Sequence, residues 1–389
     1  GAVKVRTGLE VLVEDEASRI RGRRIGLVAH PASVDAELRS AVDLVTQAGA
    51  ELVAIFGPEH GFAGDAQDMI AVSNEAGPSG LRVHSLYGTS EAELSPRREW
   101  LEDLDAIVVD LQDVGSRYYT FVWTTALVLR AAAAAGVETI VLDRPNPLGG
   151  VVVEGRPQRP GYRSFVGLYD VAVRHGMTIG EIATMVRKLE GLHEDALHVV
   201  RMQGWAREMF FDETGLPWVL PSPNMPTLDT AIVYPGGCLI EGTRMSEGRG
   251  TTRPFEIFGA PGLDGAAMAR EVAIEGARLR PLHFRPTFQK HAGKLLGGVQ
   301  VHVTDRATFR SYEAYLRMIA WAASRIAPEA RWRTEKYEYV VDRPAIDLLT
   351  GGPEFRALVD AGESVEDFVA DEQAGAAEFA DRRREFLLY

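Results

Sequence analysis

The sequence predicts an α/β fold: a Rossmann-like, doubly wound and mostly parallel sheet with a smaller C-terminal α+β subdomain. Two observations predict it. Short apolar runs alternate with helical stretches through the first 150 residues, as in parallel sheets covered by helices on both faces. The last third instead carries a strand pattern followed by long helical patterns. We therefore expect a larger subdomain over residues 1–260 and a smaller one over residues 261–389.

The individual elements follow in chain order. Four apolar runs are the expected strands of the first sheet, at residues 24–29, 52–56, 106–110 and 139–143. Helical patterns follow two of the expected strands, at residues 37–48 and 119–135, and the capping box from Thr178 to Glu181 opens a helix that reaches about residue 190. Residues 211–261 are dense in Pro and Gly, which indicates a long functional loop tract. A strand at 298–303 and helices at 305–327 and 365–387 complete the prediction.

Composition excludes several classes of function. The chain has 389 residues, 46% of them hydrophobic and 25% charged, which is ordinary for a folded protein. Its net charge of −13 and the absence of a basic, aromatic-rich stretch argue against a nucleic-acid partner. No apolar run approaches the roughly 18–20 residues of a membrane span. No signal peptide is recognisable, so we expect a cytoplasmic protein, the alternative being an exported one whose leader was removed. The composition indicates no oligomeric state.

The sequence also argues against cofactors. No Gly-x-Gly-x-x-Gly follows the first expected strand, and no phosphate-binding Gly-x-x-x-x-Gly-Lys-Ser/Thr occurs. The nine histidines are scattered without the spacing of metal ligands. We therefore expect neither a cofactor nor a bound metal.

The first candidate site is Gly57-Pro58-Glu59-His60-Gly61, directly after an apolar strand. Glycine permits close approach of a ligand, and proline ends the strand. A glutamate held in a partly desolvated position has a raised pKa and is suited to general acid catalysis. Glu59 is therefore the leading catalytic candidate, with His60 beside it.

A second cluster follows the strand that ends near residue 110. Asp110 and Asp113 are candidates for a second catalytic carboxylate or for substrate contacts. Tyr118 and Tyr119 are suited to stack on a sugar face or to donate hydrogen bonds, and Arg117 is a further candidate for substrate binding. An alternative is that Asp110 pairs with Arg117 and holds the loop.

The third cluster lies in the Pro- and Gly-rich tract. Three prolines within residues 221–226 make a rigid loop that presents Asn224. Residues 241–255 hold two carboxylates and three arginines, a composition that suits a polar, anionic ligand, because arginine binds carboxylates bidentately. The candidates here are Glu241, Glu247, Arg249 and Arg253. The alternative is a solvated, charged turn.

These segments together resemble a bacterial family of exo-β-N-acetylmuramidases, formerly a domain of unknown function, which release terminal N-acetylmuramic acid from peptidoglycan fragments. The resemblance runs in order along nearly the whole chain. It departs from the family pattern near the first strand, where the family usually has Asn-Pro-Thr/Ser-Gly and this chain has His30-Pro31-Ala32-Ser33. The matching segments are 56–61, 110–120, 142–147, 221–228, 241–243 and 246–255.

The resemblance implies a cleft between a Rossmann-like subdomain and a smaller one, with Glu59 as the catalytic residue. We expect hydrolysis of a β-glycosidic bond at the non-reducing end of a muramyl saccharide. Glu59 would act as general acid, aided by a second carboxylate or by the substrate's own acetamido group. Arg249 or Arg253 would bind the lactyl carboxylate. The candidates for the second carboxylate are Asp113, Asp110, Glu247 and Glu241.

The alternatives come from other classes of protein. A two-lobed protein that binds muramyl saccharides without turning them over would place its ligand in a similar cleft. A metal-dependent deacetylase is the other possibility, and the lack of ligand spacing argues against it.

Overall fold

The first sheet is parallel throughout and has six strands in the order β3-β2-β1-β4-β5-β6. The computed structural model describes residue 2 and residues 5–58 and 81–389. The strand order runs outward from β1 in both directions, through β2 and β3 on one side and through β4, β5 and β6 on the other, which is the topology of a doubly wound sheet. The predicted Rossmann-like fold is confirmed. The strands are β1 (Arg24–Val28), β2 (Glu51–Gly57), β3 (Arg82–Ser85), β4 (Ala106–Val109), β5 (Glu138–Leu142) and β6 (Leu197–Val200).

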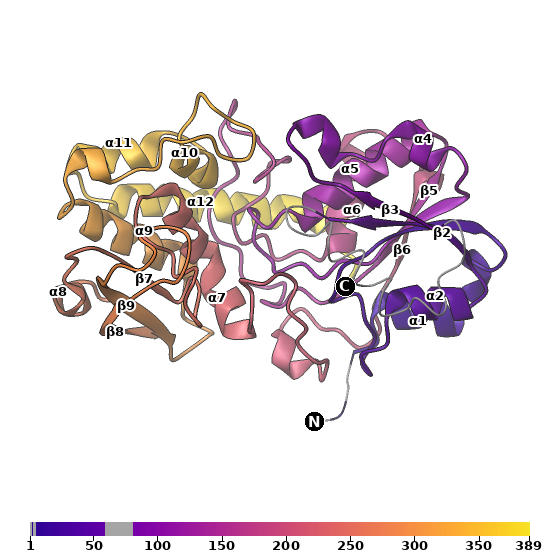
Figure 1. Ribbon diagram of the computed structural model, residues 1–389, viewed down its shortest axis with the longest axis horizontal. Helices are drawn as coiled ribbons and strands as arrows, with labels where there is room; N and C mark the ends of the chain where they lie inside the picture. Colours follow the sequence, from indigo (N-terminus) through magenta and orange to yellow (C-terminus); the bar gives the residue numbers. More distant parts are fainter. Residues whose placement is uncertain (1, 3–4, 59–80) are drawn as a thin grey trace.

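Helices cover both faces of this sheet (Figure 1). In β4, Ala106 and Val108 pack into the core formed with α1 and α2, whereas Ile107 and Val109 pack into the core formed with α5 and α6. Because side chains of a strand alternate between faces, both faces must be apolar, which explains the uninterrupted apolar runs. The helices of this part are α1 (Gly8–Asp15), α2 (Ala41–Gln47), α4 (Arg98–Leu101), α5 (Phe121–Ala134) and α6 (Ile179–Leu189).

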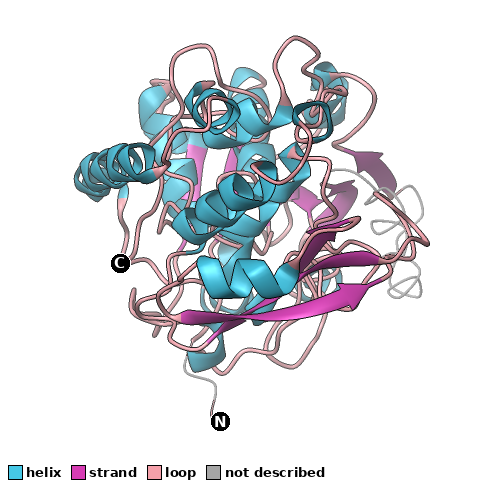
Figure 2. Ribbon diagram, turned by 90° about the vertical axis from the view of Figure 1, so that its left-hand side faces the viewer, coloured by secondary structure: helices cyan, strands magenta, loops and turns pink. Residues whose placement is uncertain are grey.

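The C-terminal part has a smaller antiparallel sheet of order β7-β9-β8. Figure 2 shows its strands below the helices of this part. Glycines bring the layers close together: a side chain at Gly265 of α8 would clash with the backbone carbonyl of Gly298 in β9. The elements are β7 (Ile257–Ala260), β8 (Ala277–Phe284), β9 (Leu296–Val303), α7 (Leu228–Gly237), α8 (Gly265–Glu271), α9 (Ser311–Ala323), α10 (Ala345–Thr350), α11 (Glu354–Asp360) and α12 (Glu366–Arg382).

Short 3₁₀ helices connect many of these elements. The one that bears on the site is η5 (Cys238–Gly242), which follows α7 directly and carries Glu241; η2 (Glu91–Leu94) follows β3. The others are η1 (Ala17–Arg19), η3 (Glu194–Ala196), η4 (Phe211–Glu213), η6 (Pro328–Ala330) and η7 (Arg383–Phe386).

The Pro- and Gly-rich tract is more ordered than its composition suggests. The prediction of one long loop was wrong over residues 228–242, where α7 is continued by η5 despite Pro235 inside the helix. Every residue of α7 except Asp229 is buried, so tertiary packing outweighs the poor helix propensity of Pro and Gly. The capping box before α6 is confirmed: the Thr178 hydroxyl accepts from the Glu181 amide, and the Glu181 carboxylate accepts from the Thr178 amide.

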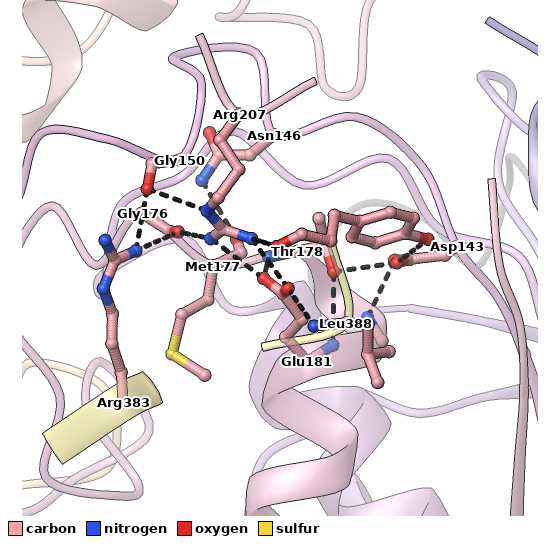
Figure 3. A network of polar contacts seen from close by, with 12 residues as sticks. Asp143, Asn146, Gly150, Gly176, Met177, Thr178, Glu181, Arg207, Arg383 and Leu388 are labelled. Atoms are coloured by element: carbon pink, nitrogen blue, oxygen red, sulfur yellow. Dashed lines mark hydrogen bonds and ion pairs between the residues drawn. The ribbon is translucent and has the colours of Figure 1, made fainter. Parts of the chain in front are cut away.

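The chain end returns to the first sheet. α12 runs back from the C-terminal part (Figure 1), and Arg383 then donates to the Gly150 carbonyl at 2.9 Å. The Leu388 amide donates to Glu181 at 2.7 Å, and the Tyr389 hydroxyl donates to Asp143 at 2.7 Å. Figure 3 shows this network at the start of α6. The two parts are therefore joined by their polar contacts as well as by the linking chain.

Over residues 5–58 and 81–389, no helix has the length and apolar character that a membrane crossing requires.

Candidate active site

The carboxyl ends of the parallel strands meet at one edge of the sheet, as the sequence predicts. β2 ends at Gly57, which is paired with Ser85 at the end of β3, and the Gly57 carbonyl accepts from the Leu86 amide at 2.8 Å. The segment leading on from β3 then enters a polar pocket through Tyr87 and Gly88. Glu59 and His60 come directly after this edge in the chain, and both lie outside the described residues.

The pocket has a volume of about 620 Å³. Its walls come from the segment after β3, from the Pro-rich loop that follows residue 220, and from the C-terminal part of the chain. Such a volume fits a ligand of the size of a small saccharide. The lining residues are Tyr87, Gly88, Thr89, Ser222, Pro223, Asn224, Glu241, Arg249, Gln289, Arg333, Lys336, Tyr337, Glu338 and Tyr339. Three of the residues predicted from the sequence are among them: Asn224, Glu241 and Arg249.

Arg249 is the centre of a charged cluster in the pocket wall. Its guanidinium forms ion pairs with Glu241 and, at 3.1 Å, with Glu247. Glu247 is paired in addition with Lys290 at 3.0 Å, and Glu241 accepts from the Tyr337 hydroxyl at 2.6 Å. The structure thus brings together Glu241, Glu247 and Arg249, which the sequence placed in one cluster.

The electrostatics of this cluster keep Glu241 ionised. Burial acts to raise the pKa of Glu241, but the attraction of Arg249 and the hydrogen bond from Tyr337 outweigh it, so the pKa lies below its ordinary value. The pKa of Arg249 is raised, because its two carboxylates outweigh the cost of burial. Glu241 is therefore a permanent anion at neutral pH, positioned against the pocket.

Asp110 and Arg117 are buried and make structural contacts. Asp110 receives two hydrogen bonds from Arg144, at 2.6 and 2.9 Å, so the alternative that it pairs with Arg117 was wrong. Arg117 donates instead to the carbonyls of Val171, at 3.0 Å, and Leu349, at 2.7 Å. Because Leu349 belongs to α10, Arg117 ties the two parts of the chain together. The structure brings neither residue into the pocket described above.

Tyr118 and Tyr119 pack in the core next to the same loop. Both are buried, and both rings lie against Tyr234 of α7, at 6.4 and 5.9 Å between centroids. Burial raises the pKa of Tyr118 well above its ordinary value. Neither ring is among the residues that line the pocket, and the stacking on a sugar face stays a prediction.

Asp113 forms a buried pair with a residue that the sequence did not indicate. One of its carboxylate oxygens accepts from the Gly115 amide at 3.0 Å and lies 3.6 Å from Nε2 of His175. The other oxygen is buried without a hydrogen bond from the described residues. The His175 Nδ1 atom accepts from the Met177 amide, which leaves the proton of the neutral ring on Nε2, facing Asp113.

Arg253 lies apart from Arg249 in a separate pocket of about 200 Å³. It is 3.7 Å from Glu256 and 4.0 Å from Asp229. The two arginines are four residues apart in sequence, but the turn between them, which contains Gly250 with a φ of +83°, directs them to different pockets. The structure therefore separates the two residues predicted to bind a lactyl carboxylate.

His30 connects the first strand to the Pro-rich loop. Its Nε2 atom accepts from the Gln112 amide at 3.0 Å, and its Nδ1 atom lies 3.2 Å from the Pro221 carbonyl. Burial, followed by the charge of Arg144, lowers the pKa of His30 to about 3. It is a neutral structural link that holds the loop carrying Asn224.

Over the described ranges, no three side chains from His, Cys, Asp and Glu are arranged to hold a metal ion.

Sequence reasoning missed several polar residues of the pocket region, among them Lys290, Arg333, Lys336 and Tyr337. These four lie 35 or more residues beyond the last predicted cluster, residues 241–255, on connections of the C-terminal part. No motif or hydrophobic period marks them, so one sequence carries no local signal that points to them.

A doubly wound sheet with a polar pocket at its strand ends, closed by a second part of the chain, is the architecture of an α/β enzyme. Comparisons with known proteins identify the family to which the chain belongs. Family models for the N-terminal and C-terminal parts of the exo-β-N-acetylmuramidase NamZ match residues 25–229 and 232–389. The chain belongs to this family. The boundary predicted near residue 260 stays a prediction.

Individual relatives agree over the full length of the chain. A peptidoglycan β-N-acetylmuramidase NamZ from Bacillus subtilis (strain 168) is 41% identical, over 99% of this chain and 92% of the relative. Two crystal structures of DUF1343 family proteins from Bacteroides fragilis NCTC 9343 share the fold. One has a TM-score of 0.86 and 33% identity over 100% of both chains; the other has a TM-score of 0.74 and 26% identity over 99% of both.

Proposed function

We propose that the protein is an exo-acting glycoside hydrolase that releases β-linked N-acetylmuramic acid from the non-reducing end of peptidoglycan fragments. The identity of 41% to a peptidoglycan β-N-acetylmuramidase, over nearly the whole chain, carries this proposal. The polar pocket of about 620 Å³ supports it. The end of β2, which precedes Glu59 in the chain, is paired with the end of β3, and the segment after β3 lines this pocket through Tyr87.

Glu59 is the proposed general acid. It would transfer a proton to the glycosidic oxygen as the bond to the sugar breaks and positive charge develops on the ring. His60, the neighbouring residue, belongs to the same proposed catalytic segment. Both assignments come from the sequence and from the family resemblance.

Glu241 is the candidate for the second carboxylate that the described geometry supports best. Of the four candidates, Asp110, Asp113, Glu241 and Glu247, it is the one that lines the pocket among the described residues. Its lowered pKa keeps it charged, as stabilisation of an oxocarbenium ion or activation of water requires. Glu247 lies behind it, paired with Arg249 and Lys290.

The function is tested by release of a chromophore from aryl β-N-acetylmuramides. Wild-type protein should release nitrophenol, and Glu59→Gln should lose at least about a hundredfold in kcat, the usual contribution of a general acid. Glu59→Gln should lose much less on a dinitrophenyl glycoside, since that leaving group departs without protonation. Glu51→Gln, at the exposed start of β2, is the matched control and should keep wild-type activity.

Two outcomes would contradict the assignments. Undiminished nitrophenol release by Glu59→Gln would remove Glu59 from the role of general acid. Tight binding of muramyl saccharides by the wild type without any turnover would favour the non-catalytic saccharide-binding protein instead.

A further inference from the structure

Among the described residues, three cations line the pocket, and they differ in what already neutralises them. Arg249 is paired with two carboxylates, those of Glu241 and Glu247. Arg333 lies 3.7 Å from Glu335 and over the ring of Tyr337, and it donates to the backbone carbonyl of Lys336 at 3.1 Å. The ammonium group of Lys336 lies over the ring of Tyr339, 5.8 Å from its centroid, but forms no ion pair within the described part of the chain. Lys336 is thus the pocket cation whose charge is available to a ligand.

The segment that carries Lys336 is held in place at both walls of the pocket. The Tyr337 hydroxyl donates to Glu241 at 2.6 Å, inside the charged cluster. The Tyr339 hydroxyl donates to the Gly88 carbonyl at 2.8 Å, in the segment after β3. Lys336 therefore precedes a turn that is anchored on both sides of the space it borders, although its own side chain is exposed.

The turn itself is strained, which is typical of ligand-binding segments. Tyr337 and Val340 exchange two backbone hydrogen bonds, at 3.0 and 2.9 Å. The residues between them, Glu338 and Tyr339, have φ values of +46° and +70°. Two-residue turns of this kind normally contain Asn and Gly, because other side chains are strained at positive φ. The two tyrosine anchors hold the backbone in this conformation.

We infer that Lys336 binds the carboxylate of the lactyl group of N-acetylmuramic acid and so makes the pocket selective for muramyl over glucosaminyl residues. The inference rests on the proposed function. We assign this role to Lys336 and not to Arg249, because Arg249 is already paired with two carboxylates of the protein itself, Glu241 and Glu247. A lysine suits this ligand, since its ammonium is a point charge on a flexible stem and follows a carboxylate on a rotatable ether. Lys336 is thereby a specificity residue, which binds a substituent of the sugar and takes no part in proton transfer.

The test compares two substrates that differ only in charge: an aryl β-N-acetylmuramide with the free lactyl acid, and the same compound with that acid converted to its primary amide. Wild-type protein should prefer the acid by about tenfold in kcat/KM, as expected for one charge-assisted hydrogen bond. Lys336→Met should remove this preference by raising KM for the acid, and turnover of the amide should be unchanged. Lys336→Arg should restore the preference.

Lys294→Met is the matched control, because Lys294 is an exposed lysine of the C-terminal part outside the pocket. It should behave as the wild type on both substrates. An unchanged preference for the acid in Lys336→Met would overturn the inference, as would equal use of acid and amide by the wild type. Failure of the proposed function is distinguishable from both results, because the wild type would then release no chromophore from either substrate.

Discussion

The hydroxyl of Tyr339 donates a hydrogen bond to the backbone carbonyl of Gly88 at 2.8 Å, although the two residues are 251 positions apart in the chain. The rings of Tyr87 and Tyr339 lie 5.9 Å apart beside this bond. The contact joins the segment after β3 to the turn of the C-terminal part, and both segments line the pocket. The shape of the pocket therefore depends on one tyrosine that bridges its walls.

Tyr339→Phe should weaken substrate binding while the protein stays folded. Loss of the hydrogen bond removes about 1 kcal/mol of stability, a typical net value for one such bond. The turn of residues 337–340 loses one of its two anchors, so we expect a several-fold increase in KM for an aryl muramide and little change in kcat. Tyr162→Phe, which alters a hydroxyl outside the pocket, should leave KM unchanged. A wild-type KM in Tyr339→Phe would show that the bridge does not shape the binding site.

Removal of the cation at the centre of the charged cluster should destabilise the protein strongly. Arg249→Met leaves the buried Glu241 without its ionic partner and Glu247 with Lys290 alone, and breaking a buried pair in this way costs about 3–5 kcal/mol of unfolding free energy in comparable cases. Denaturation by urea measures the loss. Because the pKa of Glu241 lies below its ordinary value in the wild type, the difference between wild type and variant should shrink as the pH falls and Glu241 becomes protonated.

Arg253→Met is the control for this variant within the same loop. Its side chain is 43% exposed, and its carboxylate partners are 3.7 and 4.0 Å away. We expect a change within about 1 kcal/mol, as is usual for exposed ion pairs. Equal losses from Arg249→Met and Arg253→Met would contradict the structural distinction between the two arginines.

Asp143 should make the protein less stable as the pH rises toward neutrality. Burial raises its pKa from 3.8 to about 7, against the opposing effect of the hydrogen bond from Tyr389. Between these two pKa values the folded state holds a proton on Asp143 that the unfolded state has lost. The contribution of Asp143 to the free energy of unfolding is therefore fully present below about pH 4 and is lost as the pH rises through about 7. Asp143→Asn should flatten this part of the profile of unfolding free energy against pH. Asp371→Asn, at an exposed position of α12, should retain the wild-type slope.

His30 should contribute stability with the opposite dependence on pH. Its pKa falls from 6.5 to about 3 on folding, so the contribution is present above about pH 6.5 and is lost as the pH falls toward about 3. His30→Ala removes the partners of the Gln112 amide and the Pro221 carbonyl, at a cost of about 1–3 kcal/mol for each buried group left unpaired. His283→Ala, at an exposed position of β8, should have almost no effect. A loss of stability in His30→Ala that is equal at all pH values would contradict the neutral, buried state of the ring.

Much of the first sheet could be predicted because its strands are buried on both faces. The runs at 24–29, 52–56, 106–110 and 139–143 correspond to β1, β2, β4 and β5 within two residues at each end. The helix α7 was not predicted, since Pro235 and two glycines disfavour a helix locally. The expected helix at 305–327 is shorter in the structure, where α9 covers Ser311–Ala323.

The sequence by itself determined the fold class, the family and the order of the polar segments, because these are written in hydrophobic periodicity and in contiguous motifs. The tertiary structure alone decided which polar residues share a pocket. It paired the buried Asp110 with Arg144, placed Arg253 away from Arg249, and brought Lys336 and Gly88 to the same pocket. The physical reason is that a charged residue acquires its role from the partners that folding places around it. Such partners lie as far as 246 residues away, as between Asp143 and Tyr389, beyond the reach of any local pattern.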